Sequence, residues 1–448
     1  MTVNSQGVIF DGIPGSFKKI HLKMPKGGIA LLLSKHTMIQ LNRDYANIIG
    51  HMCYAAYKLW NVCNYERLHY REQELSRYPD WYYQKSAHKA DLWYKSLPSQ
   101  TAQEVLKLLD KAWKSFYALK KSGGIENPHP PYFKQEGMVI TYMQMGIVHE
   151  SGSDLVRLSI PKQLKEHMRS AYGIHDNFLF LKNKVFQDMD RIKQIKLYPP
   201  DRKGNCRMIL IYEIPDVERK PDNGRYLSID PGLHNLLTCY DNKGSSFIIG
   251  RNYLSICREC DKEISRIQSQ WGKQQVKNGA KHPKPSKHVL RLYEKKRNRT
   301  HDYLHKLTRE IADYCKEHGI NMVVIGDLRG IREGNDKGNR VNQQLHGLPY
   351  EKIYRMLEYK LALEGISLIR QEESYSSQCS PNTPEVSKEY AKKGNRKHRG
   401  LYQENGKIWN ADAVGAYNIL RKYHAVSGGG FLMPVSGLDQ TRVVKVAV

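Results

Sequence analysis

The chain has 448 residues, of which 71 are Lys or Arg and 45 are Asp or Glu, so its formal net charge at pH 7 is +26. This basic excess is too large for an ordinary cytosolic enzyme of this size and indicates a polyanionic partner, most simply nucleic acid. The apolar runs are too short to span a bilayer, the eight cysteines are scattered, and the N-terminus has no signal-like pattern, which excludes a membrane-spanning or disulfide-rich secreted protein. We expect a cytoplasmic protein that associates with the nucleoid when it is bound to DNA.

A helical unit is predicted within the N-terminal part of the chain. From residue 41 to about 76, apolar side chains recur at steps of three and four, which predicts an amphipathic helix stopped by Pro79. A second helix is predicted to begin with Ser99 as its N-cap and to end near Gly123. Five aromatic side chains in this unit are candidates for stacking on bases, although helix packing is the simpler explanation for each one singly. They are Tyr54, Tyr57, Trp81, Tyr82 and Trp93.

Short strands flank this unit. Residues 1–40 contain two β-prone runs, and a Pro-rich segment after residue 124 leads into further strand candidates. These candidates are residues 138–142, 155–160, 192–198 and 208–214. The pattern predicts a small β-barrel interrupted by the helical unit.

A buried hairpin is predicted at residues 227–241, LSIDPGLHNLLTCYD, where the second half of the chain begins. Asp230 closes its first strand, and Pro231-Gly232 make the turn. A carboxylate at the end of a buried strand beside a tight turn is suited to hold a divalent cation against a phosphate. The alternative is that Asp230 is only a turn residue.

The rest of the second half alternates helices with strands. A basic segment from Tyr253 to about Cys315 contains a loop at 271–288 and then a helix with a cationic start. That start is either a solvated face or a nucleic-acid contact, and its position between two candidate active-site strands favours the contact. The further elements expected are strands at 321–325 and 366–370 and helices at 350–363 and 411–423, with a basic loop at 388–399.

Three motifs place carboxylates at strand ends or at a helix start: SIDPG at 228–232, VVIGDL at 323–328 and NADAVGAYNI at 410–419. Their order and spacing resemble the three split motifs of a RuvC-type nuclease. The closer resemblance is to transposon-encoded TnpB proteins and to miniature type V CRISPR effectors. NPHPPYFK at 127–134 is similar to that family's Pro-x-Phe-Lys segment, and YSSQC at 375–379 to the stretch that leads into its zinc ribbon.

The resemblance implies an α/β multidomain fold. It has an RNase H-like (RuvC) C-terminal domain and an N-terminal β-barrel (wedge) with an inserted helical recognition domain. The implied parts are wedge 1–40 and 123–220, recognition 41–122, RuvC-like 221–374 and 410–425, a degenerate zinc-ribbon-like segment 375–409 for target-strand loading, and a tail 426–448.

In this family an Asp, a Glu and a second Asp hold two Mg²⁺ ions, which stabilise the attacking water and the leaving oxygen. Asp230 matches the first position and Asp412 the third, but Gly326 stands where the Glu is expected. Asp327 is adjacent, yet neighbouring strand residues face opposite sides, so it would serve only if the strand were bulged or slipped. A relocated acid is the other route, and the candidates are Glu333, Glu358, Glu372 and Glu373.

No zinc site is expected. A tetrahedral site needs four ligands, and residues 375–409 offer only Cys379 and His398. Cys257 and Cys260 form a lone Cys-x-x-Cys pair far away in sequence, within a predicted helix, where they are most simply core or surface thiols.

We therefore expect a nuclease-deficient, RNA-guided protein that binds double-stranded DNA and regulates transcription by occupancy, through blocking or recruitment. Its cofactor would be a guide RNA, and its partners the target DNA, with a second copy of itself or a transcription-machinery protein as further candidates. Asp230 and Asp412 would form a remnant site that still holds a single Mg²⁺. The expected nucleic-acid contacts are Tyr132, Lys134, Lys296, Arg297 and Arg299.

The alternative is an active RNA-guided DNA endonuclease that uses Mg²⁺ through the two aspartates and a relocated acid. A third possibility is a guide-independent RNase H-like nuclease or a transposition accessory protein.

Overall fold

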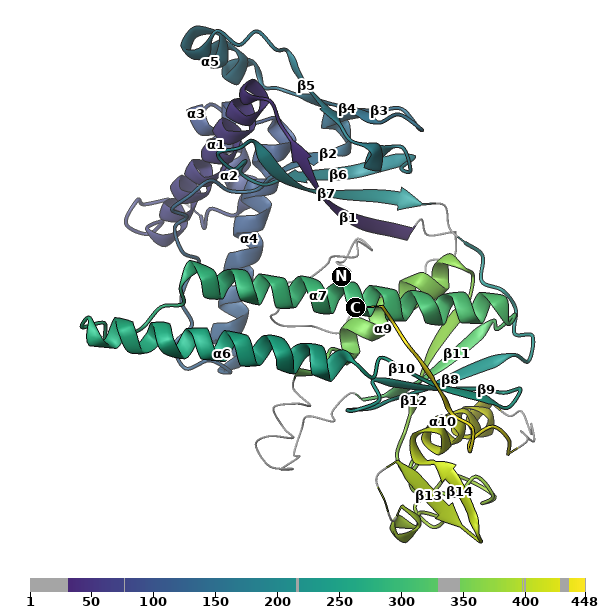
Figure 1. Ribbon diagram of the computed structural model, residues 1–448. Coiled ribbons are helices and arrows are strands. Elements are labelled where there is room, and N and C mark those ends of the chain that lie inside the picture. The colour runs from purple at the N-terminus through teal and green to yellow at the C-terminus, as the bar shows by residue number, and fades with distance from the viewer. Residues whose placement is uncertain are drawn as a thin grey trace. The chain divides into compact units, whose positions relative to one another are not determined.

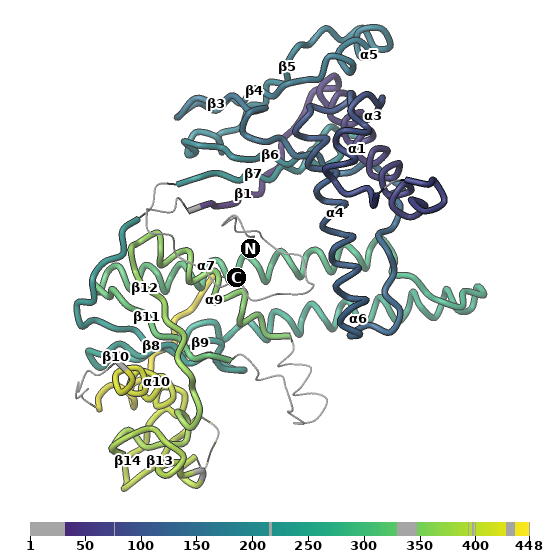
Figure 2. Tube along the Cα trace, turned by 180° about the vertical axis from the view of Figure 1, so that it is seen from behind, coloured from purple at the N-terminus to yellow at the C-terminus, as the bar shows by residue number. Residues whose placement is uncertain are grey.

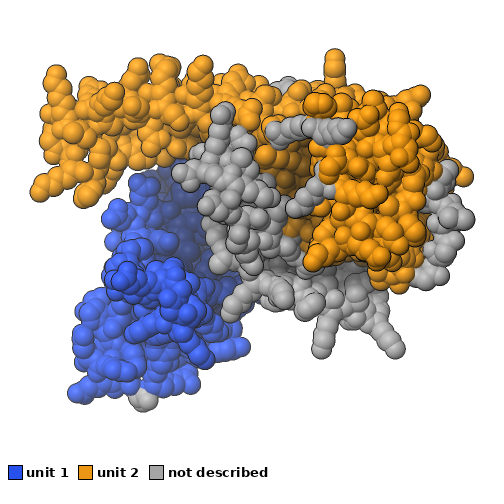
Figure 3. All heavy atoms as spheres, turned by 90° about the horizontal axis from the view of Figure 1, so that it is seen from below, with its two compact units in different colours: residues 1–216 blue, residues 217–448 orange. Residues whose placement is uncertain are grey.

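The fold is that of a computed structural model (Figure 1), which describes residues 31–75, 77–214, 217–328, 347–396, 398, 400–427 and 435–447. The chain divides into two compact units, residues 1–216 and 217–448 (Figure 3). Within the described residues, no helix is long and apolar enough to cross a membrane.

Unit 1 contains the predicted helical insertion. It consists of α1 (Arg43–Leu68), α2 (Trp81–Ala87), α3 (Leu92–Lys95) and α4 (Ser99–Ser122). The Asn42 side chain caps α1 by accepting a hydrogen bond from the Tyr45 backbone N–H at 2.7 Å. Helix α1 ends earlier than predicted, because the chain turns after Leu68. The N-cap of α4 is Pro98 rather than Ser99, and its C-cap is Gly123 in the left-handed conformation.

The strands of unit 1 form two antiparallel sheets. One has the order β1-β7-β6-β2 and the other the order β3-β4-β5. Their bounds are β1 (Leu31–Gln40), β2 (Ile140–Met143), β3 (Ile147–His149), β4 (Leu155–Ser159), β5 (Phe178–Lys182), β6 (Arg191–Leu197) and β7 (Asn205–Ile214). The four strands predicted after residue 124 are confirmed, whereas β3, β5 and α5 (Lys162–Tyr172) were not predicted. The described strands pair as two sheets and not as one closed barrel.

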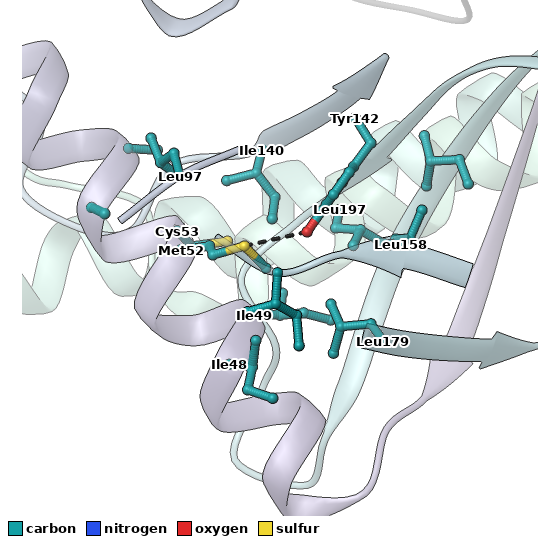
Figure 4. Packing of buried hydrophobic residues seen from close by; sticks show 14 of the residues in the cluster. Ile48, Ile49, Met52, Cys53, Leu97, Ile140, Tyr142, Leu158, Leu179 and Leu197 are labelled. Atoms are coloured by element: carbon teal, nitrogen blue, oxygen red, sulfur yellow. Dashed lines mark hydrogen bonds between the residues drawn. The ribbon is translucent and has the colours of Figure 1, made fainter. Parts of the chain in front are cut away.

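A single hydrophobic core joins the helices of unit 1 to both sheets (Figure 4). The apolar face of α1 supplies Ile48, Ile49 and Met52, which pack against side chains from the strands. Tyr142 of β2 lies in this core, and its hydroxyl group donates to the Ser159 carbonyl oxygen at 2.9 Å. The helical insertion and the sheets therefore form one packed unit.

Unit 2 is built on a six-stranded sheet with the order β12-β11-β8-β9-β10-β15. Strands β8, β9 and β10 form an antiparallel meander, which contains the predicted hairpin. Strand β11 runs parallel to β8, β12 runs parallel to β11, and β15 runs parallel to β10. The bounds are β8 (Tyr226–Pro231), β9 (Leu237–Asp241), β10 (Ser245–Ile249), β11 (Met322–Asp327), β12 (Ser367–Glu372) and β15 (Arg442–Val444).

Helices cover both faces of this sheet, with α10 on one face and α7 and α9 on the other (Figures 1 and 2). Helices α6 and α7 lie side by side as a long hairpin, in which α6 continues into the predicted 271–288 loop as far as Lys277. A small hairpin, β13-β14, precedes α10. The bounds are α6 (Tyr253–Lys277), α7 (Lys287–Glu317), α9 (Tyr350–Leu363), α10 (Ala411–Ser427), β13 (Leu401–Glu404) and β14 (Lys407–Asn410). Short 3₁₀ helices lie at Gln144–Gly146, Lys184–Phe186 and Lys393–Asn395.

Candidate active site

Asp230 lies near the end of β8, beneath helix α10. In the β8–β9 register it is opposite Thr238, one step from the turn. Its carboxylate occupies the space that a Cβ atom on Gly415 would need, closer than real Cβ atoms approach any neighbour. The glycine in α10 is therefore required so that the helix can pass directly over the Asp230 carboxylate.

Asp412 lies in the first turn of α10. The Asn410 side chain caps this turn by accepting from the backbone N–H groups of Asp412 and Ala413 at 3.0 and 3.1 Å. Both carboxylate oxygens of Asp412 are engaged: Asn235 Nδ2 donates to Oδ2 at 2.8 Å, and an Arg396 guanidinium N–H donates to Oδ1 at 2.8 Å. Asn235, in the turn between β8 and β9, and Arg396, in the basic loop, therefore both contact Asp412 of the third motif.

Gly326 faces the same site from β11. The β11–β12 register is continuous through this point, with Gly326 opposite Gln371 and Asp327 opposite Glu372, so β11 is neither bulged nor slipped. Glu373 Oε2 fills the space that a Cβ atom on Gly326 would need, and Ile419 Cδ1 lies 3.1 Å from that position. The missing side chain of the second motif is therefore replaced in space by the carboxylate of Glu373.

The other candidate acids do not share this position. Glu372 is exposed and pairs with Lys422 Nζ. Burial raises the pKa of Glu358 on α9, and the nearby positive charge of Arg370 opposes that rise. Asp327 lies 4.0 Å from the same arginine, as expected for a residue on the other side of its strand. Glu333 lies outside the described residues.

The carboxylates of Asp230, Glu373 and Asp412 interact at the site. Burial raises the pKa of Asp230 well above its ordinary value, and the negative charges of Glu373 and Asp412 add to this rise while Arg396 opposes it. Burial, with the charges of Glu372 and Asp327, raises the pKa of Glu373 to about 7. Glu373 Oε2 is buried and has no hydrogen-bond partner among the described residues.

This donor set fits a divalent cation in its chemistry, because Mg²⁺ prefers carboxylate oxygens and would relieve the repulsion that raises these pKa values. The set is not a closed cage as it stands: within the described part of the chain, no group of three or more His, Cys, Asp or Glu side chains is already placed to hold a metal. Asp412 would have to release Arg396 to join Asp230 and Glu373.

Hydrogen bonds from α10 hold the segment that precedes the small hairpin. Asn418 Nδ2 donates to the carbonyl oxygens of Ser376 and Cys379 at 2.7 and 2.8 Å, and Arg421 donates to the Ser380 carbonyl oxygen at 3.1 Å. The Cys379 thiol contacts the Ser387 carbonyl oxygen at 3.2 Å. Side-chain hydrogen bonds therefore tie this segment to α10.

The other potential zinc ligands considered from the sequence are Cys257, Cys260 and His398, and among the described residues they form no group that could hold a metal. Cys257 and Cys260 lie on α6 as free thiols, Cys260 buried and Cys257 partly so. His398 bridges to Leu401 through its backbone.

The Pro-rich loop presents Tyr132 and Lys134 from a rigid support on α1. Trp60 Nε1 donates to the Tyr132 carbonyl oxygen at 3.2 Å, and Asn61 forms two hydrogen bonds with the Lys134 backbone at 2.7 and 2.8 Å. The Tyr132 ring is 73% exposed. The loop backbone is thus fixed while its side chains stay accessible, as a contact loop requires.

The cations predicted on α7 are engaged within unit 2. Lys296 pairs with Asp261 at 2.5 Å and Arg299 with Glu259 at 2.9 Å, which ties α7 to α6. Arg297 pairs with Glu294 on its own helix at 3.5 Å. Lys296 and Arg299 therefore reinforce the helical hairpin, whereas Arg297 pairs within α7, and contact of all three with nucleic acid stays a prediction.

The aromatic candidates form two clusters that also contain lysines. Tyr54 packs edge-on against Tyr57 and Trp93, with ring centroids 4.9 and 5.6 Å apart, and Lys58 lies 5.3 Å from both tyrosine rings. Trp81 and Tyr82 are 3.9 Å apart, beside further lysines. Base stacking by these rings stays a prediction.

Two family models match the chain. One, OrfB_IS605, described as a probable transposase, matches residues 209–332, and the Cas12f1-like TNB domain matches residues 350–419. No curated protein sequence matches the chain.

Solved structures show the same likeness. A Cas12f1–sgRNA–target DNA complex aligns with a TM-score of 0.54 at 15% identity, covering 84% of this chain and 83% of that chain. A CRISPR–Cas12f ternary complex aligns with a TM-score of only 0.35 at 16% identity, covering 84% and 82%, which is too low to add to the argument. The predicted resemblance to TnpB proteins and miniature type V effectors is thus confirmed, and the mixed α/β multidomain fold resembles that of Cas12f1.

Three residues of the site have roles that the sequence did not reveal: Asn235, Arg396 and Gly415. Gly415 carried a usable signal, because a glycine inside an apolar helix often marks a close approach. Asn235 and Arg396 carried none, because a turn asparagine and an arginine in a basic loop are ordinary.

Proposed function

We propose that the protein is an RNA-guided DNA endonuclease whose cutting site is formed by Asp230, Glu373 and Asp412. One observation carries this proposal: the carboxylate of Glu373 lies in the space left by Gly326, beside the buried Asp230. A site that had merely lost its second acid would be expected to fill that space with apolar side chains, because an unpaired buried carboxylate is costly.

The sheet of unit 2 supports a nuclease domain of the RNase H-like (RuvC) class. Its meander β8-β9-β10, extended by the parallel strands β11 and β12, brings the ends of β8 and β11 together under α10. That arrangement is the one a split three-motif site needs. We assign unit 1 as the wedge and recognition part on the position of its helical insertion between β1 and β2.

Guide RNA and target DNA are the partners we propose. The net charge of +26 requires a polyanionic partner, and the Cas12f1 structure of similar fold is a complex with an sgRNA and target DNA. Sequence recognition would then rest on pairing between the RNA and the DNA, while the protein holds the duplex by its shape and backbone.

In the mechanism, the chain's residues prepare a site for Mg²⁺. When bound, the metal would activate the attacking water and stabilise the leaving oxygen of the phosphodiester. Asp230 and Glu373 would hold it from the sheet side and Asp412 from the start of α10. Before that, Glu373 must give up the proton that its raised pKa retains near neutral pH, and Arg396 must leave Asp412.

The second candidate is the nuclease-deficient, DNA-binding protein that acts by occupancy in the cytoplasm, blocking a promoter or recruiting transcription machinery. The specific observation in its favour is that both oxygens of Asp412 are already engaged, by Asn235 and Arg396. A cutting site that could not release these contacts would bind its target without cleaving it.

Cleavage by the purified protein with its co-purifying RNA separates the two candidates. With matched DNA and Mg²⁺, we expect cutting that is lost in Glu373→Gln and in Asp230→Ala but kept in Glu372→Gln, a matched change at the neighbouring, exposed glutamate. A stable shifted complex without cutting, in wild type and variants alike, would instead establish the second candidate. Absence of co-purifying RNA would favour a guide-independent nuclease.

A further inference from the structure

The three-stranded sheet of unit 1 has one apolar, buried face and one accessible face. On β5, Phe178 and Phe180 share the accessible face, because side chains two positions apart on a strand point the same way. The register places Phe180 opposite Arg157 of β4, and Arg157 opposite Val148 of β3, in one cross-strand row. The other face is fully buried and consists of Val156, Leu158, Leu179 and Leu181.

Apolar side chains on the accessible face are open to solvent. Phe180 is 45% exposed, Val148 48% and Leu155 40%. In contrast to these three, Phe178 is partly covered by cations: the Arg157 guanidinium lies 4.5 Å from its ring centroid and Lys165 Nζ lies 5.2 Å from it. In the described part of the chain, no carboxylate forms an ion pair with either cation. The face therefore combines an open aromatic ring with positive charge that protein groups do not neutralise.

Single-stranded nucleic acid matches this chemistry better than a protein surface does. An apolar partner would bury Arg157 and Lys165 without a counter-charge, which is costly. An acidic peptide would neutralise the cations, but it can stack on Phe180 only where it also carries an aromatic side chain, whereas every nucleotide carries both a phosphate and a base. An unpaired stretch of polynucleotide supplies both, with phosphates for the cations and bases for the ring.

We propose that this face, formed by β3, β4 and β5, is a stacking platform for unpaired bases of the guide RNA. The inference rests on the proposed function, in which the target strand is paired with the guide. Before target DNA binds, the unpaired bases in the complex are those of single-stranded parts of the RNA, the kind of RNA that sheet-borne aromatic side chains bind. Phe180 stacks on a base, and Arg157 and Lys165 hold the adjoining phosphates.

The affinity of the full-length protein for its co-purified RNA, stripped and re-bound in a filter assay, tests the platform. We expect Phe180→Ala to weaken binding roughly fivefold to a hundredfold, the effect of about one lost base stack. Phe180→Tyr keeps a planar ring and should stay within about twofold of wild type. Val443→Ala is the control, because it removes a similarly exposed apolar group from β15 in unit 2, which is not part of the proposed platform.

A second readout keeps the proposal testable if Phe180→Ala folds poorly. Ultraviolet cross-linking of the wild-type protein–RNA complex, followed by mass spectrometry, should attach RNA to the peptide that contains Phe178 and Phe180. Arg157→Gln should lower the slope of log Kd against log salt concentration by roughly 0.7, the value for one phosphate contact on a single strand.

The proposal is overturned if RNA binds the wild-type protein tightly but Phe180→Ala binds within twofold of it and the peptide carries no cross-link. It is also overturned if the peptide cross-links to a second copy of the chain, or if it cross-links to the displaced DNA strand and not to RNA when matched DNA is added to the complex. If the wild-type protein binds no RNA at all, the proposed function itself fails, which is a different result from either of these.

Discussion

At the scale of single residues, the main feature of the candidate site is that one residue's carboxylate fills the space left by another residue that has no side chain. Gly326 leaves a space in β11, and Glu373, which follows β12, places its carboxylate there. The two positions are coupled by sterics, because any side chain at position 326 would meet Glu373 Oε2, Ile419 and Pro231. Gly326 and Glu373 therefore need to be considered as a pair, and the glycine alone does not decide whether the protein cuts DNA.

Substitution of Gly326 should disturb the site in proportion to side-chain size. We expect Gly326→Ala to destabilise the fold by about 1–3 kcal/mol, as overpacking of a filled site does, and to lower cleavage. Gly326→Glu should abolish cleavage by displacing Glu373. Combining Gly326→Glu with Glu373→Ala should recover part of the activity, because one carboxylate again occupies the space. Denaturant unfolding and a cleavage assay measure the two effects, and full activity in Gly326→Glu alone would contradict the coupling.

The raised pKa of Glu373, about 7, predicts how the stability of the metal-free protein depends on pH. The folded state binds this proton more tightly than the unfolded state does, so the contribution to stability is fully present below the ordinary pKa of about 4.3 and is lost as the pH rises through about 7. At pH 8 Glu373→Gln should therefore be more stable than wild type by on the order of 1–3 kcal/mol.

Chemical denaturation in the absence of metal at pH 5 and pH 8 checks this sign. The difference between wild type and Glu373→Gln should be smaller at pH 5, and Mg²⁺ should stabilise the wild type at pH 8. A wild type that is more stable than the variant at pH 8 without metal would show that the Glu373 carboxylate has a partner.

At the scale of elements, helix α10 contacts three separate parts of unit 2. Its first turn carries Asp412, Gly415 makes room for Asp230, and Asn418 holds the chain before the β13-β14 hairpin. Three consecutive turns of one helix therefore link two acids of the site to residues 376–380. The carbonyl groups of that segment are held by α10.

Loss of the Asn418 side chain should release this segment. Asn418→Ala leaves two carbonyl oxygens without their donor in a buried place, and we expect a loss of about 2–4 kcal/mol in stability. Gln403→Ala, an exposed amide on the neighbouring β13, is the matched control and should be neutral. In buffer with excess Mg²⁺, a zinc-selective chelator should leave the thermal unfolding of the wild type unchanged, and a large drop in Tm with this chelator would show that zinc holds the segment.

Sequence patterns predicted the elements better than their contacts. The hairpin at 227–241, the strand at 321–325 and the helix at the third motif follow directly from periodicity and turn residues. Strand β3 has only three residues and gives no clear pattern, and β5 was not predicted either. The loop predicted at 271–288 overlaps the last residues of α6, from Trp271 to Lys277, because the polar sequence there hides the face of the helix.

The site itself was predicted only in part. The motifs predicted Asp230 and Asp412 as site residues. Glu373 was one of four candidate acids, because sequence spacing cannot show which side chain enters the space beside Gly326. The β11–β12 register and the packing of α10 decide that, and both are tertiary contacts between distant segments.

At the scale of the whole molecule, the chain is a basic protein of two units, with a Cas12f1-like fold and a candidate carboxylate site. The proposed binding of guide RNA and target DNA is the same whether or not the chain cuts. Only the chemistry at the end of β8 separates an endonuclease from a protein that acts by occupancy.

Cleavage of matched DNA by the wild type and by Glu373→Gln, each with its RNA and Mg²⁺ and at equal target occupancy, is the most direct test of the central claim. We predict cutting by the wild type, a fall of at least about a hundredfold in the variant, as for removal of a group that stabilises the transition state, and no fall in Glu372→Gln. Equal cutting by wild type and Glu373→Gln, or a wild type that occupies its target without any cutting, would contradict it.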